Sequence, residues 1–326
     1  MYLLTGFPHL LTRHLAEAIL ARTPDIPVAL LVQERYAEQA RQLYGEHARV
    51  FVGDNAAMHL GLSTPEYKEL TQTCTDVVHA AGIDDSRDAH GTRAVLDLAL
   101  DCRHLRRLTH FSTVFVSGDR KGIVAEDELS SGQAFRTPWE HACFEGEILV
   151  RRAMGQLPCS VLRPSLLLEE AFEGPFAPAM RVVVSPLEDP LPLPGDGAAP
   201  LHVVPVEFVV ASAMAIHHDA RAVGRTFHLV DPNPPSVRRV YELVAQRAGK
   251  ALPKAPLAAR LGDALRNLPV VDRLAREQRP AAAWLEQLAF YTSRNTQELV
   301  PGLHCPPMEH WIDKLIDLAR AKVRAS

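Results

Sequence analysis

The stretch Tyr2-Leu3-Leu4-Thr5-Gly6-Phe7-Pro8-His9 joins a short apolar run to a glycine turn. The residues after it follow a helical period. One face of that helix carries Leu11, Leu15, Ala18 and Ile19. A buried strand, a glycine turn and an amphipathic helix, in this order, are what the first unit of a parallel α/β sheet requires.

The pattern repeats along the first half of the chain. Apolar runs recur at 28–32, 50–52, 76–80, 111–116 and 160–162, and helical patterns occupy 36–43 and 92–100. Runs that are apolar on both faces, with helices between them, indicate a parallel sheet covered on both sides. The sequence therefore predicts an α/β fold with a Rossmann-like doubly wound sheet and right-handed crossovers.

The pattern loosens after Arg163-Pro164. The proline- and glycine-rich residues 171–200 indicate a long loop, residues 203–215 a run that returns to the sheet, and residues 231–326 mostly helices. We expect a dinucleotide-binding-type domain from 1–165 plus 200–230. A smaller, mostly helical substrate-cap region, 166–199 plus 231–326, is expected over the C-terminal ends of the strands, where such folds bind ligands.

Composition excludes several classes of protein. The chain has 326 residues, 47% of them hydrophobic, and can bury a core without disulfides or a structural metal. Its 35 Lys and Arg against 39 Asp and Glu argue against nucleic-acid binding, which needs a basic surface. The longest apolar runs are far shorter than the ~20 residues of a membrane span, and no signal peptide is expected ahead of Tyr2.

The cysteines and histidines lack the spacing of a disulfide or metal framework. Five cysteines are an odd number, and none forms a C-x-x-C pair. The 15 histidines show no H-E-x-x-H pattern. We expect no metal site and a reducing, cytoplasmic location.

A basic segment spans residues 254–279. It carries six basic and three acidic side chains, and leucines at 257, 261, 265 and 268 form one apolar stripe. A basic amphipathic helix can lie on a membrane surface or meet a protein partner. The simpler interpretation, which we favour, is a lid helix packed on its own domain.

Short motifs in the right order along nearly the whole chain resemble the extended short-chain dehydrogenase/reductases. These motifs are Thr5-Gly6-Phe7-Pro8, Gly53-Asp54, His79-Ala80-Ala81, Gly91-Thr92, Phe111-Ser112-Thr113, Arg163-Pro164 and Val203-Val204-Pro205-Val206. Two others, Gly61-Leu62-Ser63 and Pro306-Pro307, resemble the branch of fatty-acyl and thioester reductases. The resemblance implies NAD(P) as cofactor and an acyl thioester or related carbonyl compound as substrate.

The resemblance places Gly6, His9 and Thr12 at the three glycine positions of the family's phosphate-binding turn. The second glycine lets the pyrophosphate approach the backbone, and the third lets helix and strand pack closely. A side chain at His9 intrudes on that approach, although its imidazole could instead donate to a phosphate. We expect weak or absent NAD(P) binding.

The remaining cofactor contacts implied by the resemblance are Asp54, Ala80, Arg163 and Pro164. The Asp54 carboxylate could accept a hydrogen bond from the adenine amine, or it could simply cap a turn. The acid Glu34 would favour NAD and Arg35 would favour NADP. Both alternatives remain open.

The catalytic pair of the family is a tyrosine followed four residues later by a lysine, and this sequence has Trp139 and Cys143 at those positions. The tyrosine exchanges a proton with the substrate oxygen, and the lysine lowers the pKa of the tyrosine. An indole N–H donates hydrogen bonds but is no exchangeable acid near neutral pH. Losing a positioned acid costs about 10²–10⁴ in rate.

Other residues offer partial substitutes. Ser112 and Thr113 could still hydrogen-bond a carbonyl oxygen, but they do not supply the proton that reduction needs. His141 is two residues from Trp139 and so faces away from it on a helix. Cys143 is either a nucleophile with a lowered pKa or, as we favour, an inert buried thiol.

Three hypotheses follow. The favoured one is a pseudoenzyme that retains the fold and binds a small-molecule ligand, an acyl thioester or a protein partner. The alternative is an active NAD(P)H-dependent reductase of an acyl thioester or related carbonyl with a non-standard proton donor. The third and weakest is a lipid-surface protein that docks through residues 254–279. Fold alone does not choose between them.

Overall fold

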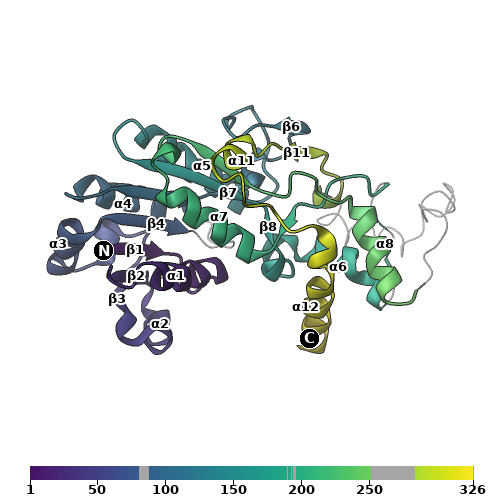
Figure 1. Cartoon of the computed structure of the whole chain (residues 1–326), viewed down its shortest axis with the longest axis horizontal. Helices are drawn as coiled ribbons and strands as arrows, with labels where there is room; N and C mark the ends of the chain where they lie inside the picture. Colours follow the sequence, from purple (N-terminus) through teal and green to yellow (C-terminus); the bar gives the residue numbers. More distant parts are fainter. Residues whose placement is uncertain (81–87, 189, 192, 194–195, 251–282, 326) are drawn as a thin grey trace.

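The computed structural model describes residues 1–80, 88–188, 190–191, 193, 196–250 and 283–325. Its centre is a parallel sheet of seven strands in the order β3-β2-β1-β4-β5-β7-β10 (Figure 1). The strands are β1 (Tyr2–Thr5), β2 (Val28–Val32), β3 (Ala48–Val52), β4 (Asp76–Ala80), β5 (Arg107–Phe111), β7 (Cys159–Pro164) and β10 (Thr226–Leu229). The strand order reverses between β1 and β4, which confirms the predicted doubly wound α/β fold.

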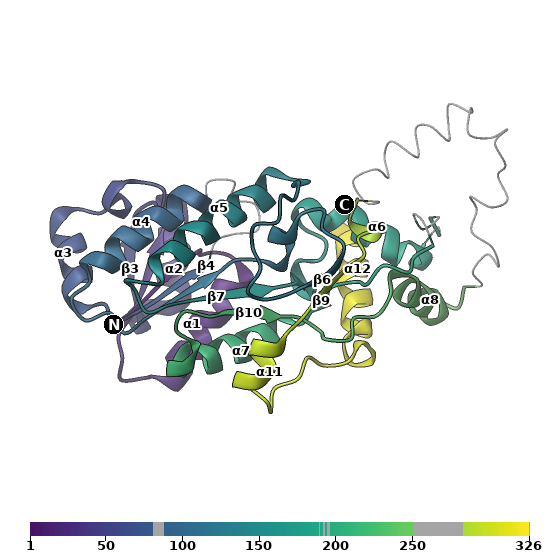
Figure 2. The same ribbon diagram turned by 90° about the horizontal axis from the view of Figure 1, so that it is seen from above.

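Helices cover both faces of this sheet (Figure 2). One face carries α1 (Leu10–Arg22), α2 (Ala37–Tyr44) and α7 (Val206–His218), and the other carries α3 (Thr64–Thr73), α4 (Asp88–Asp101) and α5 (Pro138–Ala153). Every residue of the central strands β1, β2, β4, β5 and β7 is buried, because side chains on both faces are covered.

A further apolar core lies beyond the C-terminal ends of the strands. Its helices α6 (Ala177–Val184), α8 (Val237–Arg247) and α12 (Ile312–Ala325) pack together at one end of the molecule (Figure 1). Two short parallel pairs join this region to the sheet. They are β6 (Gly122–Val124) with β11 (Ala289–Tyr291), and β8 (Leu166–Leu167) with β9 (Val203–Val204). The short helix α11 (Arg294–Leu299) packs beside β10 and α7.

The structure differs from the sequence prediction at three places: the strand predicted at 203–215, the loop predicted at 171–200 and the strand predicted at 111–116. Residues 203–215 form the two-residue β9 and then α7, while the strand that returns to the sheet is β10. Because α7 is buried between α1 and the sheet, its sequence is apolar on most sides and lacks a helical stripe. The predicted loop 171–200 contains α6. The strand predicted at 111–116 is β5 at 107–111, followed by a 3₁₀ turn at 114–117.

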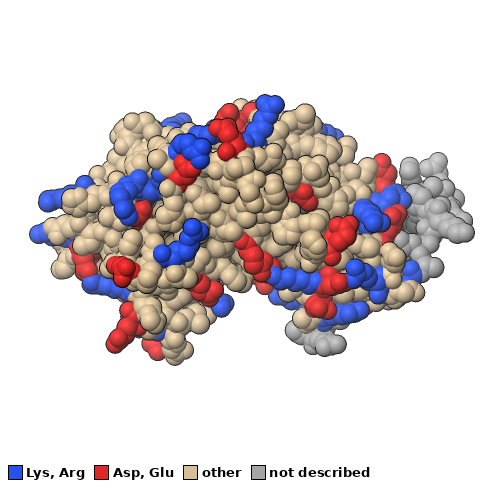
Figure 3. All heavy atoms as spheres, viewed as in Figure 1, with Lys and Arg blue, Asp and Glu red and all other residues tan. Residues whose placement is uncertain are grey.

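The surface of the described residues fits the charge balance of the sequence. On the face shown in Figure 3, acidic and basic side chains are interspersed, without a broad patch of one sign. No helix in the described part of the chain is both long and apolar enough to cross a membrane. The basic segment 254–279 lies outside the described residues, so its surface role stays a prediction.

A buried ion pair joins the sheet to α5. Arg163 on β7 donates two hydrogen bonds to the Glu147 carboxylate, at 2.8 and 2.7 Å, and both side chains are about 1% exposed or less. Arg151 and Ser112 each donate a further bond to Glu147, at 2.8 and 2.7 Å. Burial alone would raise the pKa of Glu147, but the charge and hydrogen bonds of Arg163, with those of Arg151 and Ser112, lower it to about 2.

Substitution Glu147→Gln is expected to lower the free energy of unfolding by about 3 kcal/mol or more, because it leaves the Arg163 guanidinium buried without a counter-charge. Urea unfolding at neutral pH measures this. Glu145→Gln is the matched control on the same helix: its side chain is 53% exposed, and the expected change is within about 0.5 kcal/mol. Equal effects of the two substitutions would contradict the assigned role of the ion pair.

A second buried polar side chain, His110, has no counter-charge or hydrogen bond of this kind among the described residues. His110 on β5 is fully buried, and neither ring nitrogen has a hydrogen-bond partner among the described residues. Its ring lies 5.2 Å from that of His79 on the neighbouring strand β4. Burial lowers the pKa of His110 to about 4, against a weaker opposing influence of Glu147. The folded protein therefore holds His110 neutral, whereas the unfolded chain protonates it near pH 6.5.

Because the folded-state pKa is depressed, stability should fall as the pH drops from about 6.5 towards 4. His110→Leu is expected to reduce this pH dependence and to leave the free energy of unfolding at pH 8 unchanged or higher. The reason is that leucine is similar in size to histidine but has no buried polar atom without a hydrogen-bond partner. Thermal melts between pH 8 and pH 5 measure both. The exposed His104→Leu should behave like the unsubstituted protein; a steeper acid loss in His110→Leu would refute this account.

Candidate functional site

A small cavity lies where the C-terminal ends of β1, β4, β5 and β7 meet. Its volume is about 60 Å³. The structure brings six predicted site residues to its wall: His9, Ala80, Ser112, Thr113, Trp139 and Pro164. Four others, Gly6, Asp54, Cys143 and Arg163, do not line it.

The glycine turn after β1 is determined by a close approach between strands. Gly6 has φ +96°, and a Cβ there would lie 1.7 Å from the carbonyl oxygen of Ala80 on β4. Only glycine fits this position. Thr12, at the third glycine position, is buried and its Oγ1 donates to the Thr5 carbonyl at 3.3 Å, which holds α1 against β1.

His9 is the N-cap residue of α1, and its side chain lines the cavity. Its backbone N–H donates to the Gly6 carbonyl at 3.0 Å, which closes the turn. An imidazole therefore stands at the N-terminus of the helix, where the family's second glycine would leave the backbone open to a phosphate.

Asp54, which was predicted to contact the adenine of the cofactor, caps a turn after β3. Its Oδ1 accepts a hydrogen bond from the Ala56 N–H at 2.9 Å, and its own N–H donates to the Leu60 carbonyl at 2.9 Å. The preceding Gly53 is held tightly, since a Cβ there would lie 2.3 Å from the Leu60 oxygen. The geometry supports the turn-capping interpretation of Asp54, and a contact with adenine stays a prediction.

Helix α5 carries Trp139 and Cys143, the residues predicted to stand at the family's catalytic positions. Its N-terminus is set by a capping box between Thr137 and Glu140, with Pro138 in the first turn. The four-residue spacing places Trp139 and Cys143 on one face of the helix. Cys143 is 4% exposed. His141 is 52% exposed, lies 3.7 Å from Glu145, and does not line the cavity.

The Trp139 indole belongs to a cluster of four aromatic rings. Phe176 lies at its centre, with ring centroids 5.8 Å from Trp139, 4.6 Å from Phe115 and 4.2 Å from Trp284. These distances are those of packed aromatic pairs, and Trp284 also packs edge-on to Phe115 at 5.2 Å. Three of the four rings, those of Phe115, Trp139 and Phe176, line the cavity.

The two hydroxyl groups that remain from the family's site are both engaged. Ser112 Oγ donates to the Glu147 carboxylate at 2.7 Å. Thr113 Oγ1 donates to the Pro164 carbonyl at 3.4 Å and accepts from the Phe115 N–H at 3.3 Å. Arg163, which was predicted to contact the cofactor, turns its guanidinium to Glu147.

Several residues of the site escaped sequence reasoning. Glu170 and Ser165 line the cavity, and Ser165 Oγ has no hydrogen-bond partner among the described residues. Phe115, Phe176 and Trp284 come from separate parts of the chain. Of these residues, only Glu147 could have been noticed in the sequence. It is an acidic residue on the apolar, buried face of α5, where an acid is rare unless it is paired.

The described residues do not fit the nicotinamide end of a dinucleotide in the family's usual pose. About 60 Å³ holds only a few water molecules, whereas small-molecule sites span ~300–1,000 Å³. The lining residues include neither a tyrosine nor a lysine. Among the residues described, no group of three or more His, Cys, Asp or Glu side chains is placed to hold a metal ion.

Comparison with solved structures shows the same fold. The terminal R domain from the myxalamid PKS-NRPS biosynthetic pathway matches with a TM-score of 0.77 at 21% identity, covering 99% of this chain and 90% of that one. The reductase (R) domain of a nonribosomal peptide synthetase from Mycobacterium tuberculosis matches with a TM-score of 0.68 at 19% identity, covering 98% and 91%. The dTDP-glucose 4,6-dehydratase from Bacillus anthracis str. Ames, solved with NAD, matches with a TM-score of 0.67 at 15% identity, covering 98% and 96%.

The sequence itself matches one family model. No curated protein matches the sequence significantly. The model described as "Male sterility protein", an NAD-binding family, matches residues 4–213, well over half of the chain. This chain therefore belongs to the Male sterility protein family.

Proposed function

We propose that this protein is a pseudoenzyme of its family, which retains the reductase fold but lacks the usual hydride-transfer chemistry. The observation that carries the proposal is the Trp139 indole, held in a ring cluster at the position where the family has its catalytic tyrosine. The proposed role is binding of a small molecule, an acyl thioester or a protein partner, and a cytoplasmic location remains a prediction.

The chemistry of the replaced residues supports this proposal. Reduction of a carbonyl needs a proton at the substrate oxygen, and an indole N–H does not release one near neutral pH. The buried Cys143 thiol has no fixed positive charge to assist a neighbouring acid or to hold a cofactor ribose. No other residue of α5 lines the cavity, so the helix does not supply a substitute.

The packing supports the same conclusion. The rings of Phe115, Trp139 and Phe176 take up the space beside Thr113. Binding a nicotinamide there would require these rings to separate and would expose apolar surface at ~25 cal/mol per Å². We therefore propose that NAD(P) binding is weak or absent.

One observation favours the alternative, an active reductase of an acyl thioester or related carbonyl. His9 and Glu170 line the same cavity as Thr113, and imidazole and carboxyl groups are the side chains that most often act as general acids. Either could serve as a non-standard donor beside the Thr113 hydroxyl. This alternative requires that NAD(P)H binds and that the aromatic cluster opens.

The pseudoenzyme proposal predicts that the purified protein neither oxidises NADH or NADPH with long-chain acyl-CoA nor gains thermal stability at millimolar cofactor. The double variant Trp139→Tyr/Cys143→Lys restores the family pair and should oxidise the cofactor at least as fast as the unsubstituted protein. Its matched control, Trp139→Phe/Cys143→Lys, lacks only the phenol oxygen. Turnover by the unsubstituted protein that exceeds the Tyr/Lys variant would overturn the proposal.

If the unsubstituted protein does oxidise NAD(P)H, the alternative predicts that Glu170→Gln or His9→Gln lowers the rate by about 10²–10⁴, the cost of losing a positioned acid. Glu173→Gln, a half-exposed acid that pairs with Lys322, is the control and should leave the rate unchanged. Activity that survives both cavity substitutions would contradict a donor at either position.

A further inference from the structure

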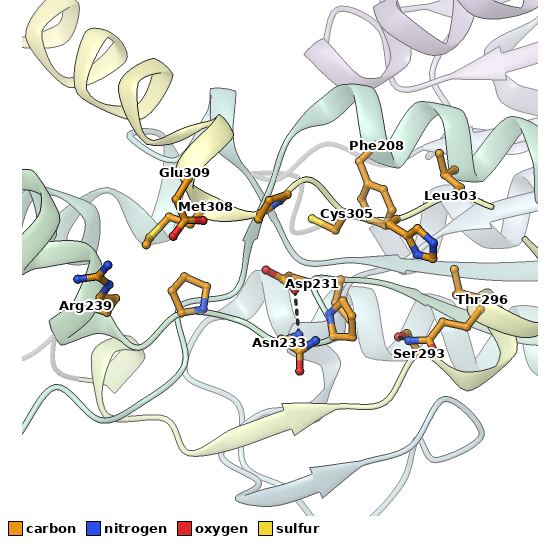
Figure 4. Close-up of a pocket in the computed structure, with 16 residues that line it drawn as sticks. Phe208, Asp231, Asn233, Arg239, Ser293, Thr296, Leu303, Cys305, Met308 and Glu309 are labelled. Carbon is orange, nitrogen blue, oxygen red and sulfur yellow. Dashed lines mark hydrogen bonds between the residues drawn. The ribbon is translucent and has the colours of Figure 1, made fainter. Parts of the chain in front are cut away.

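Figure 4 shows a second, larger cavity, whose volume is about 470 Å³. Its walls come from the loop after β10 (230–235), the start of α7, Arg239 on α8, the start of α11 and the C-terminal segment 303–309. It shares no lining residue with the cavity at Trp139. Its volume lies within the ~300–1,000 Å³ typical of small-molecule sites.

The charged side chains of this cavity are two carboxylates and one guanidinium: Asp231, Glu309 and Arg239. None of them forms an ion pair with another described residue. Asp231 is half-buried, and its Oδ1 accepts a hydrogen bond from the Asn233 N–H at 2.9 Å. Burial raises the pKa of Asp231, and that one hydrogen bond only partly offsets it. A positive ligand group at this carboxylate would supply the missing compensation.

The backbone of the cavity wall lacks an N–H donor at three positions. Three lining residues, Pro232, Pro235 and Pro307, have carbonyl oxygens but no N–H. An anion such as phosphate needs several N–H donors, and these three positions of the wall cannot provide one. The carbonyl oxygens of Pro235 and Pro307 already accept backbone hydrogen bonds, at 2.8 and 2.9 Å, so the acceptor that this cavity offers to an ammonium group is the Asp231 carboxylate.

Apolar side chains form the rest of the wall. Phe208, Val230 and Met308 are each 6% exposed or less, and they reach the cavity from α7, the end of β10 and the C-terminal segment. Figure 4 shows Phe208, Cys305 and Leu303 on one side of the cavity and Asn233 on the other, with Asp231 between. A ligand with a charged group and an apolar body fits this division.

The one thiol of the cavity wall points to binding rather than catalysis. Cys305 is partly buried, and burial together with the nearby Asp231 raises its pKa to about 12. A thiol in that environment stays protonated near neutral pH and is a poor nucleophile.

We propose that this cavity binds a small organic cation, an amine with an apolar body, whose ammonium group pairs with Asp231 and whose body packs against Phe208 and Met308. The site is independent of the cavity at Trp139, so it does not depend on whether the family's chemistry is retained.

The test compares three probes that share one apolar body: phenethylamine (cationic), N-acetylphenethylamine (neutral) and phenylpropionate (anionic). Each is titrated into the full-length protein at pH 8 by isothermal calorimetry and ligand-observed NMR. The expected result is saturable millimolar binding of the amine, as a ligand of this size allows, with at least fivefold weaker binding of the other two. No saturable binding of phenethylamine, or equal binding of phenylpropionate, overturns the proposal.

Two variants locate the bound amine. Asp231→Asn keeps the shape of the side chain and removes its charge, and it should weaken amine binding at least fivefold while leaving the neutral probe unchanged. Asp25→Asn, an exposed acid in the loop before β2, is the matched control and should bind like the unsubstituted protein. Equal amine affinity in Asp231→Asn and the unsubstituted protein refutes the site. Thermal melts of both variants exclude unfolding as the cause of any loss.

Discussion

The interaction on which the site depends is the buried pair of Glu147 and Arg163. It joins α5 to β7, and through Ser112 it reaches the end of β5. Arg163 also donates to the Glu128 carbonyl at 2.9 Å, so the same guanidinium anchors the segment after β6. A bidentate pair with every oxygen satisfied tolerates burial, whereas either partner alone would not. The pair fixes the helix that carries Trp139 and Cys143 against the sheet.

The contacts that hold the sheet together are separate from the side chains at positions 139 and 143. The sheet is held by buried strands, the close approach at Gly6 and the Glu147 pair, none of which needs a phenol at 139 or an ammonium at 143. Trp139 instead contributes apolar packing with Phe115 and Phe176. The packed indole buries apolar surface at this position, and that burial adds to stability.

The two cavities differ in volume and in how many of their polar side chains have a partner within the protein. At the cavity near Trp139, the Ser112 and Thr113 hydroxyls are used within the protein, and the volume is small. At the cavity near Asp231, the volume is larger and three charged side chains form no ion pair with a described residue. Charged groups without an ion-pair partner around open volume favour ligand binding.

The sequence by itself determined the class of fold, since alternating apolar runs and helical patterns permit little except a covered parallel sheet. It also showed which chemical groups stand at positions 139 and 143. It did not distinguish α7 from a strand, because a helix buried on most sides loses its polar face. Only the tertiary structure decided that Phe115, Trp139, Phe176 and Trp284 meet, that Glu147 is an ion-pair partner, and that Asp231 faces an open cavity. Such groupings join residues distant along the chain, and local periodicity contains no information about which of them become neighbours in space.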